Sequence, residues 1–156
     1  MRVTRRLLEY WQSTLTDGQP PTRTEIDPAA IKDILPFVLL GDIETDPFRV
    51  FFRLIGTAVA EFSRWDFTGS YLDELVYDAR DSVEWRQCYE IVHARRIGLV
   101  GDNVLSFTDG RVATYEFAIL PLRRGDDPAG SFIAVESYEG FDRTNIPDIT
   151  PVKRGG

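Results

Sequence analysis

The stretch FVLLGDIETDPFRVFFRLIGTA, residues 37–58, decides the fold of this chain. Two apolar runs, 37–44 and 49–55, flank the turn pair Asp46-Pro47. This pattern predicts a β-hairpin, and Gly56 ends its second strand. The residues before the hairpin have helical spacing instead, so the stretch marks the point where a helical start gives way to a sheet.

The pattern after the hairpin predicts a helical middle and a second group of strands. Short helices are expected over 57–63 and 71–75, and a longer helix over 79–96 with Asp78 as its N-cap. Strands are expected over 99–107, 111–122 and 131–139, the first two joined by a tight turn at Asp109-Gly110. This order predicts an α+β fold with a five-stranded antiparallel sheet and helices on one face.

A helical extension is predicted before the hairpin. Helical spacing over 3–17 places four apolar residues on one face, namely Leu7, Leu8, Trp11 and Leu15. Asp27 and Pro28 are typical of the cap and first position of a second short helix. We therefore expect an N-terminal helical extension over 1–36, a domain over 37–140 and a flexible tail over 141–156.

Composition excludes several classes of protein. The 156 residues suffice for one domain, and 43% apolar with 28% charged residues is typical of a soluble globular protein. A net charge of −7 argues against nucleic acid as a partner. No apolar run approaches the ~18 residues that membrane insertion requires. One His and one Cys are too few for a zinc site. We expect a cytoplasmic protein with no metal site.

The element order resembles that of a PAS domain. The segments FRLIGTA (52–58) and DFTGSYLDEL (66–75) resemble the PAS signature, and residues 135–137 do so more weakly. The opening helix with Trp11, the segment IDPAAI (26–31) and Leu35-Pro36 resemble a stand-alone bacterial PAS family with an N-terminal helical extension. The resemblance spans about residues 5–140 and implies a PAS-like fold in a bacterial sensory or regulatory protein.

This chain departs from that family at one turn. The family commonly has Gly-Arg before the Asp of an Asp-Leu-Thr-Gly turn, where this chain has Arg64 and Trp65. A side chain at position 64 predicts that the turn does not require a positive φ there. Trp65 adds a large flat surface at a place that often borders the PAS cavity.

Aromatic residues are predicted to gather between the sheet and the helices. They indicate either simple core packing or a small apolar cavity with Tyr hydroxyls and Arg53 as polar groups. Strand alternation places Phe52 with Leu54 on one face, and Tyr115 with Phe117 on one face. The candidate ligand-binding residues are Phe52, Arg53, Trp65, Tyr71, Tyr89, Val92, His93, Tyr115 and Phe117.

His93 is the only imidazole, on the predicted long helix. In haem-binding PAS domains a His of this helix ligates iron, so the resemblance raises haem as a cofactor. Helical spacing places His93 near Tyr89 and Arg96, which favours a partly buried structural role. We therefore expect no cofactor and no catalytic residues. The alternative is a small cone-shaped α+β enzyme in which His93 acts with a carboxylate.

Cys88 is expected to fill the core. The Asn-Cys-Arg-Phe motif of flavin-adduct PAS domains is absent from the sequence. Glu84 lies one helical turn before Cys88, and its charge raises the pKa of the thiol and lowers its reactivity.

The resemblance implies a sensory domain rather than an enzyme. It would bind a small ligand or an unidentified signalling protein and act through protein–protein contact; a pure interaction module with a filled core is the other alternative. The stripe formed by Leu7, Leu8, Trp11 and Leu15 must be covered, by its own sheet or by a second copy. We expect a homodimer with these four residues at the interface.

Overall fold

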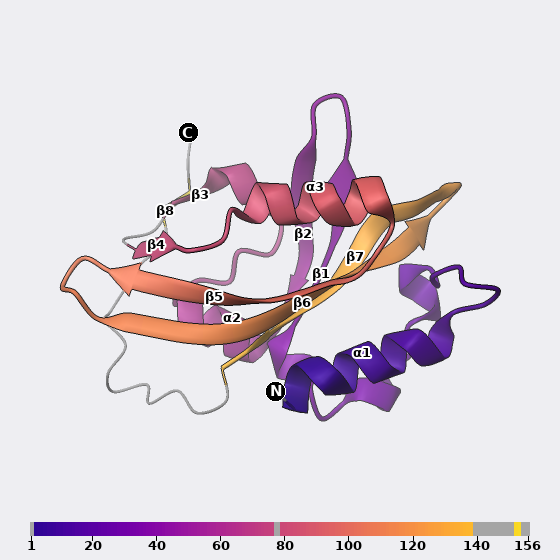
Figure 1. Cartoon of the computed structure of the whole chain (residues 1–156), viewed down its shortest axis with the longest axis horizontal. Helices are drawn as coiled ribbons and strands as arrows, with labels where there is room; N and C mark the ends of the chain where they lie inside the picture. The colour runs from indigo at the N-terminus through magenta and orange to yellow at the C-terminus, as the bar shows by residue number, and fades with distance from the viewer. Residues whose placement is uncertain (1, 77–78, 139–151, 154–156) are drawn as a thin grey trace.

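The computed structural model describes residues 2–76, 79–138 and 152–153. Its centre is an antiparallel sheet in the order β2-β1-β7-β6-β5-β4 (Figure 1). The strands are β1 Val38–Glu44, β2 Arg49–Ile55, β4 Ala79–Asp81, β5 Leu99–Phe107, β6 Val112–Arg124 and β7 Asp127–Ser137. The α+β prediction with an antiparallel sheet is confirmed, but the sheet has six strands rather than five.

The sixth strand, β4, occupies the start of the predicted long helix. Its residues pair with Leu105–Phe107 of β5. The Asn103 side chain then accepts a hydrogen bond from the Ser82 backbone N–H at 3.1 Å, which continues the extended conformation. The helix α3 therefore runs over Trp85–Arg95. The predicted cap Asp78 lies outside the described residues.

The other helices follow the predicted order. They are α1 Arg2–Thr14 and α2 Thr57–Ser63, with the 3-10 helices η1 Arg23–Glu25, η2 Pro28–Ile31, η3 Leu35–Phe37 and η4 Leu72–Glu74. The helix α1 ends at Thr14, so Leu15 follows it. None of the described helices is long and apolar enough to cross a membrane.

The turn after α2 does require a positive φ, contrary to the expectation from its sequence. Arg64 has a φ of 58°, and its backbone N–H bonds to the carbonyls of Ala60 and Glu61. A left-handed residue with a side chain costs about 1–2 kcal/mol. The following residue, Trp65, is thereby directed back toward the sheet, where its ring lies 6.2 Å from that of Phe67.

A β-bulge changes which side chains of β2 are buried. Leu40 pairs with Leu54 but Gly41 pairs with Phe52, so Arg53 is an extra residue. Phe52 is buried whereas Leu54 is 44% exposed. The expectation that these two share a buried face is therefore wrong. A side chain at Gly41 would lie 2.2 Å from the Phe51 carbonyl oxygen, so only glycine fits beside the bulge.

The central strands are buried on both faces. α2, α3 and η4 cover the face that we call inner, and α1 with η2 covers the opposite, outer face (Figure 1). Along β6, Phe117 and Ile119 belong to the inner core, whereas Leu120 and Leu122 belong to the outer core. Burial on both faces explains the nearly continuous apolar run of this strand.

The N-terminal extension packs against its own sheet. Leu7 is fully buried, and Leu8 and Trp11 pack partly buried in the same outer core. The Trp11 Nε1 donates a hydrogen bond to the Pro121 carbonyl at 2.9 Å. The Asp27 carboxylate accepts from the Ala29 N–H at 3.0 Å, which confirms the predicted cap. The stripe is thus covered within one chain, and the homodimer stays a prediction.

The predicted tail, 141–156, lies mostly outside the described residues. Its described part is the short strand β8, Val152–Lys153, which pairs antiparallel with β3, Leu75–Val76, in a separate two-stranded sheet.

Candidate ligand-binding site

A cavity of about 600 Å³ lies on the inner face of the sheet. It is bordered by α2, η4, α3 and the segment that leads into α3. Its aromatic walls come from both the sheet and the helices, and they comprise Phe48, Phe52, Phe62, Trp65, Phe67, Trp85, Tyr89, Tyr115, Phe117 and Tyr138.

The aromatic walls are held by contacts between ring edges and faces. The rings of Trp85 and Phe117 lie 4.7 Å apart at 67°, and those of Phe52 and Phe67 lie 5.0 Å apart at 86°. Phe62 stacks on Tyr138 at 4.1 Å. Such pairs contribute about 0.5–1.5 kcal/mol each beyond the burial of their area. They fix rigid walls around the cavity.

Glu136 places a carboxylate in this aromatic cavity. It follows Phe132 and Ala134 at two-residue spacing on β7, so strand alternation points it inward. Its Oε2 accepts a hydrogen bond from the Tyr138 hydroxyl at 3.0 Å. Burial raises the pKa of Glu136 to about 7; hydrogen bonds from Tyr138 and Tyr115 oppose the rise, and the charge of Asp81 adds to it.

Asn103 organises the polar groups beside Glu136. This fully buried side chain donates to the Asp81 carboxylate at 2.8 Å and to the Tyr115 hydroxyl oxygen at 3.0 Å. Because Tyr115 accepts that bond, its own proton is available to Glu136. The network joins β4, β5, β6 and β7 at one end of the cavity.

Five predicted residues line the cavity together. They are Phe52, Trp65, Tyr89, Tyr115 and Phe117. Val92 is fully buried in the inner core but does not reach the cavity. Val92 lies on the buried side of α3, as its helical spacing predicted.

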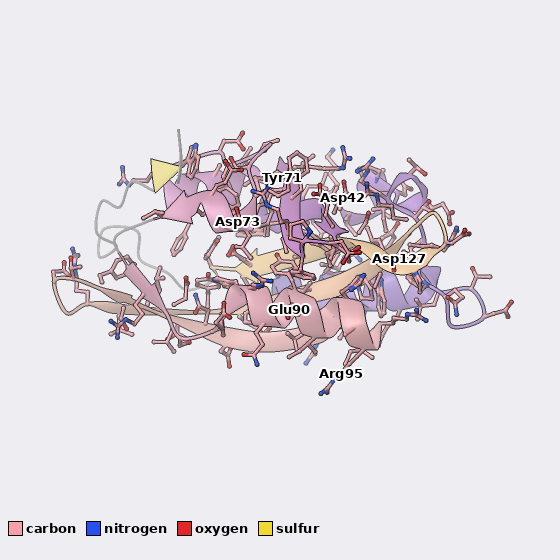
Figure 2. All side chains as sticks on the ribbon, turned by 90° about the horizontal axis from the view of Figure 1, so that it is seen from above. Asp42, Tyr71, Asp73, Glu90, Arg95 and Asp127 are labelled. Carbon is pink, nitrogen blue, oxygen red and sulfur yellow. The ribbon has the colours of Figure 1, made fainter. Side chains whose placement is uncertain are left out.

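Arg53 and Tyr71 do not line the cavity. Because Arg53 is the bulged residue of β2, it points to the outer face and pairs with Asp42. Tyr71 lies against the outside of β2, where its hydroxyl donates to Glu44 at 3.0 Å and its ring carries the Arg49 guanidinium at 3.5 Å. Figure 2 shows Tyr71 beside Asp73 on this side of the molecule.

His93 does meet a carboxylate, contrary to the helical-spacing argument. Its Nε2 lies 3.1 Å from the Asp127 Oδ2 at the start of β7, and its ring contacts Phe48. Burial raises the pKa of Asp127, but hydrogen bonds from Ala129 and His93 outweigh it and hold that pKa below its usual value. His93 does not line the aromatic cavity, so it is not positioned to ligate a group held there.

Cys88 is half-buried on α3 and also lies outside the cavity lining. Burial raises the pKa of its thiol, and the charge of Glu84 adds to the rise as predicted. Among the residues that the structure describes, no three His, Cys, Asp or Glu side chains gather to hold a metal ion.

The sequence prediction missed the polar half of the site. Glu136 could have been found from its two-residue spacing after Ala134, since an acid on the inward side of an apolar strand is unusual. Trp85 shares a helical face with Tyr89 and could have been added in the same way. Asp81 and Asn103 gave no signal, because the first was assigned to a helix and the second depends on a distant partner.

Comparisons with known proteins identify the fold around this cavity. A family model described as "PAS domain" matches residues 1–135, which confirms the resemblance found in the sequence. A solved structure, the dark structure of the blue-light photoreceptor Aureochrome1 LOV, is similar with a TM-score of 0.51 at 10% identity. The similarity covers 74% of this chain and 83% of that one, and it shows the fold alone. No curated protein matches the chain.

Proposed function

The chain belongs to the PAS domain family, since the family model spans most of its length. We propose that it is a sensory domain that binds a small molecule. The ligand occupies the inner-face cavity, and binding changes how the domain contacts a signalling partner. The His93–Asp127 pair of the enzyme alternative lies outside this cavity, in a separate hollow that it shares with Arg96 and Asp126.

The cavity itself carries this proposal. Protein interiors are close-packed and contain few voids larger than a water molecule. A space of about 600 Å³ with mostly apolar walls and a few converging polar groups is the size and character of a small-molecule site. This observation favours a ligand-binding sensor over an interaction module with a filled core.

Strand β7 offers a route from the ligand to the surface. Glu136 faces the cavity, whereas its neighbour Val135 belongs to the outer core together with Val3 and Leu7 of α1. A ligand that moves Glu136 therefore shifts the floor on which α1 rests. A 13-residue helix is only marginally stable alone, so α1 responds to changes in that support.

We place the output at α1 and its surroundings. Leu8, Trp11 and Leu15 keep part of their surface exposed, and a homodimer or another protein partner would use that surface. A bacterial, cytoplasmic setting belongs to the same proposal.

The experiment is a saturation-transfer NMR screen of small aromatic compounds against the wild type and two variants. Val83→Trp fills the cavity from its lining, and Val112→Trp adds the same side chain at a position that is 62% exposed. Compounds that bind the wild type should bind Val112→Trp and not Val83→Trp, with circular dichroism confirming that both variants fold. Equal binding to both variants, or no binding to the wild type, would contradict the proposal.

A further inference from the structure

We propose that the cavity selects organic ammonium compounds with an aromatic group over neutral and anionic compounds of the same shape, and that Glu136 discriminates between these charges. The inference rests on the proposed function, because it names the chemical class of the ligand for the same cavity. It is carried by the charge of the cavity floor, the position of the arginines and the chemistry of the walls.

The floor of the cavity holds the Glu136 carboxylate, which forms no ion pair with a cation among the described residues. Glu136 and Asp81 both line it. The described hydrogen-bond partners of Glu136 are the Tyr115 and Tyr138 hydroxyls, which carry no charge. Among the described residues no Arg, Lys or His forms an ion pair with Glu136. A bound ammonium group would supply the positive charge that the described residues do not place beside Glu136.

The arginines that border the cavity are engaged at its rim. Arg49 pairs with Asp73 at 2.8 Å, and Arg86 pairs with Glu90 at 2.8 Å on the exposed side of α3. The third, Arg80, is exposed. An anionic ligand beside Glu136 would therefore meet a carboxylate that none of the described arginines pairs with.

The walls also favour a cation. Tryptophan rings attract cations most strongly of the aromatic side chains, and cages of aromatic rings bind alkylammonium groups. Trp65 and Trp85 both line this cavity, together with the rings of Phe52, Phe117 and Tyr115. The aromatic walls and the Glu136 carboxylate thus both favour a positively charged ligand, through separate interactions.

Retention of an acid at this place is itself informative. A carboxyl group in an apolar site costs free energy unless its charge is compensated, and an apolar residue would fill the site more cheaply. The titratable groups that face Glu136 are Tyr89 from α3, Tyr115 from β6, Asp81 from β4 and Tyr138 after β7. All of them are neutral or negative, so none compensates the Glu136 charge as a cation would.

The test uses three indole compounds that differ in charge. Tryptamine is a cation, tryptophol is neutral and indole-3-propionate is an anion at neutral pH. Isothermal titration at physiological salt should show tryptamine binding the wild type at least about tenfold more tightly than tryptophol, with indole-3-propionate the weakest. In Glu136→Gln most of the preference for tryptamine over tryptophol should be lost, and the affinity for tryptophol should be unchanged.

A matched control separates the cavity from the general charge of the protein. Glu90→Gln removes the same charge from an exposed position on α3 (Figure 2), so the preference for tryptamine should persist in this variant. Asp81→Asn should reduce the preference partially and serves as a second variant if Glu136→Gln fails to fold. A preference that is as large in Glu136→Gln as in the wild type would reflect the net charge of −7 rather than Glu136, and would overturn the inference.

The outcomes also distinguish this inference from the proposed function. If tryptophol binds the wild type as tightly as tryptamine, and Val83→Trp abolishes both, the cavity binds ligands and the charge selection is wrong. If none of the three compounds binds the wild type, the charge selection is wrong as well. In that case the saturation-transfer NMR screen of aromatic compounds tests the proposed function separately.

Discussion

The two faces of the central sheet are built from different side chains. The outer face is covered by aliphatic residues such as Leu7, Leu120 and Ile133, each exposed by at most 1%. The inner face is covered mainly by rings, and it keeps a cavity of about 600 Å³. Branched aliphatic chains interdigitate and fill space, whereas rings that meet edge to face act as rigid walls. Side-chain shape therefore separates the supporting face from the binding face.

Each face also holds one carboxylate, buried on the outer face and partly buried on the inner face, and the two have different partners. On the outer face Asp42 is 3% exposed, pairs with Arg53 and accepts a hydrogen bond from the Ser131 hydroxyl at 2.7 Å. On the inner face Glu136 receives bonds from tyrosine hydroxyls only. Among the described residues, a cation therefore compensates the charge on the outer face but not the charge on the inner face.

The largest expected effect tests whether the outer face is the more tightly packed. Leu120→Ala should lower the free energy of unfolding by about 3–5 kcal/mol, because a cavity opens in a filled core. Leu105→Ala should cost less, about 2 kcal/mol, because Leu105 is equally buried but borders an existing cavity. Urea unfolding measures both. Equal costs for the two variants would break the comparison.

The second effect tests the uncompensated carboxylate through pH. Because the pKa of Glu136 is raised to about 7, this residue binds a proton more tightly in the folded protein than in the unfolded chain. Its contribution to stability is present below about pH 4.5 and is lost as the pH rises through 7. Glu136→Gln lacks this titration, so wild type should lose about 2 kcal/mol relative to the variant between pH 5 and 8.5.

Urea unfolding of both proteins at the two pH values measures this difference. Glu90→Gln is the matched control, since Glu90 is exposed on α3 and its removal should leave the pH dependence of wild type unchanged. Parallel pH profiles for wild type and Glu136→Gln would show that Glu136 titrates like a solvated acid.

The sequence predicted the fold better than it predicted the site. Alternation and turn residues placed β1, β2, β5 and β6 closely, because each strand carries its own local pattern. The same reasoning failed where a distant partner decides the structure. β4 forms because β5 offers it an edge, and Leu54 turns outward because a bulge shifts the register of β2 against β1.

The cavity residues divide in the same way. Phe52, Trp65, Tyr89, Tyr115 and Phe117 were found because large aromatic residues on inward positions are visible in a sequence. Arg53 was misplaced because it depends on the bulge, and Tyr71 because its partners Glu44 and Arg49 lie on β1 and β2. The surroundings of His93 were predicted from its own helix alone, whereas its partner Asp127 is the first residue of β7.

The third effect tests the compensated carboxylate of the outer face. Arg53→Gln should lower the free energy of unfolding by about 1 kcal/mol, because it removes a cation from the buried Asp42 but Arg53 itself is half-exposed and screened by water. Tryptamine affinity should be unchanged, since Arg53 points away from the cavity. A loss of affinity in this variant would show that the two carboxylates are not independent.

The smallest effect concerns His93, which lies at the border between the two regions. Its bond to Asp127 is 3.1 Å long, but both side chains keep contact with solvent, at 24% and 43% exposure. Exposed and half-exposed pairs contribute about 0–1 kcal/mol, so His93→Ala should lower the free energy of unfolding by about 0.5 kcal/mol. Arg95→Ala, two residues further along α3 with its side chain directed away from the molecule (Figure 2), is the matched control and should leave the free energy of unfolding unchanged.

Because His93 does not line the cavity, the affinity of either variant for tryptamine should equal that of wild type. A loss of affinity in His93→Ala alone would mean that the His93–Asp127 contact positions α3 over the cavity, which would make this border part of the binding region rather than of the supporting one.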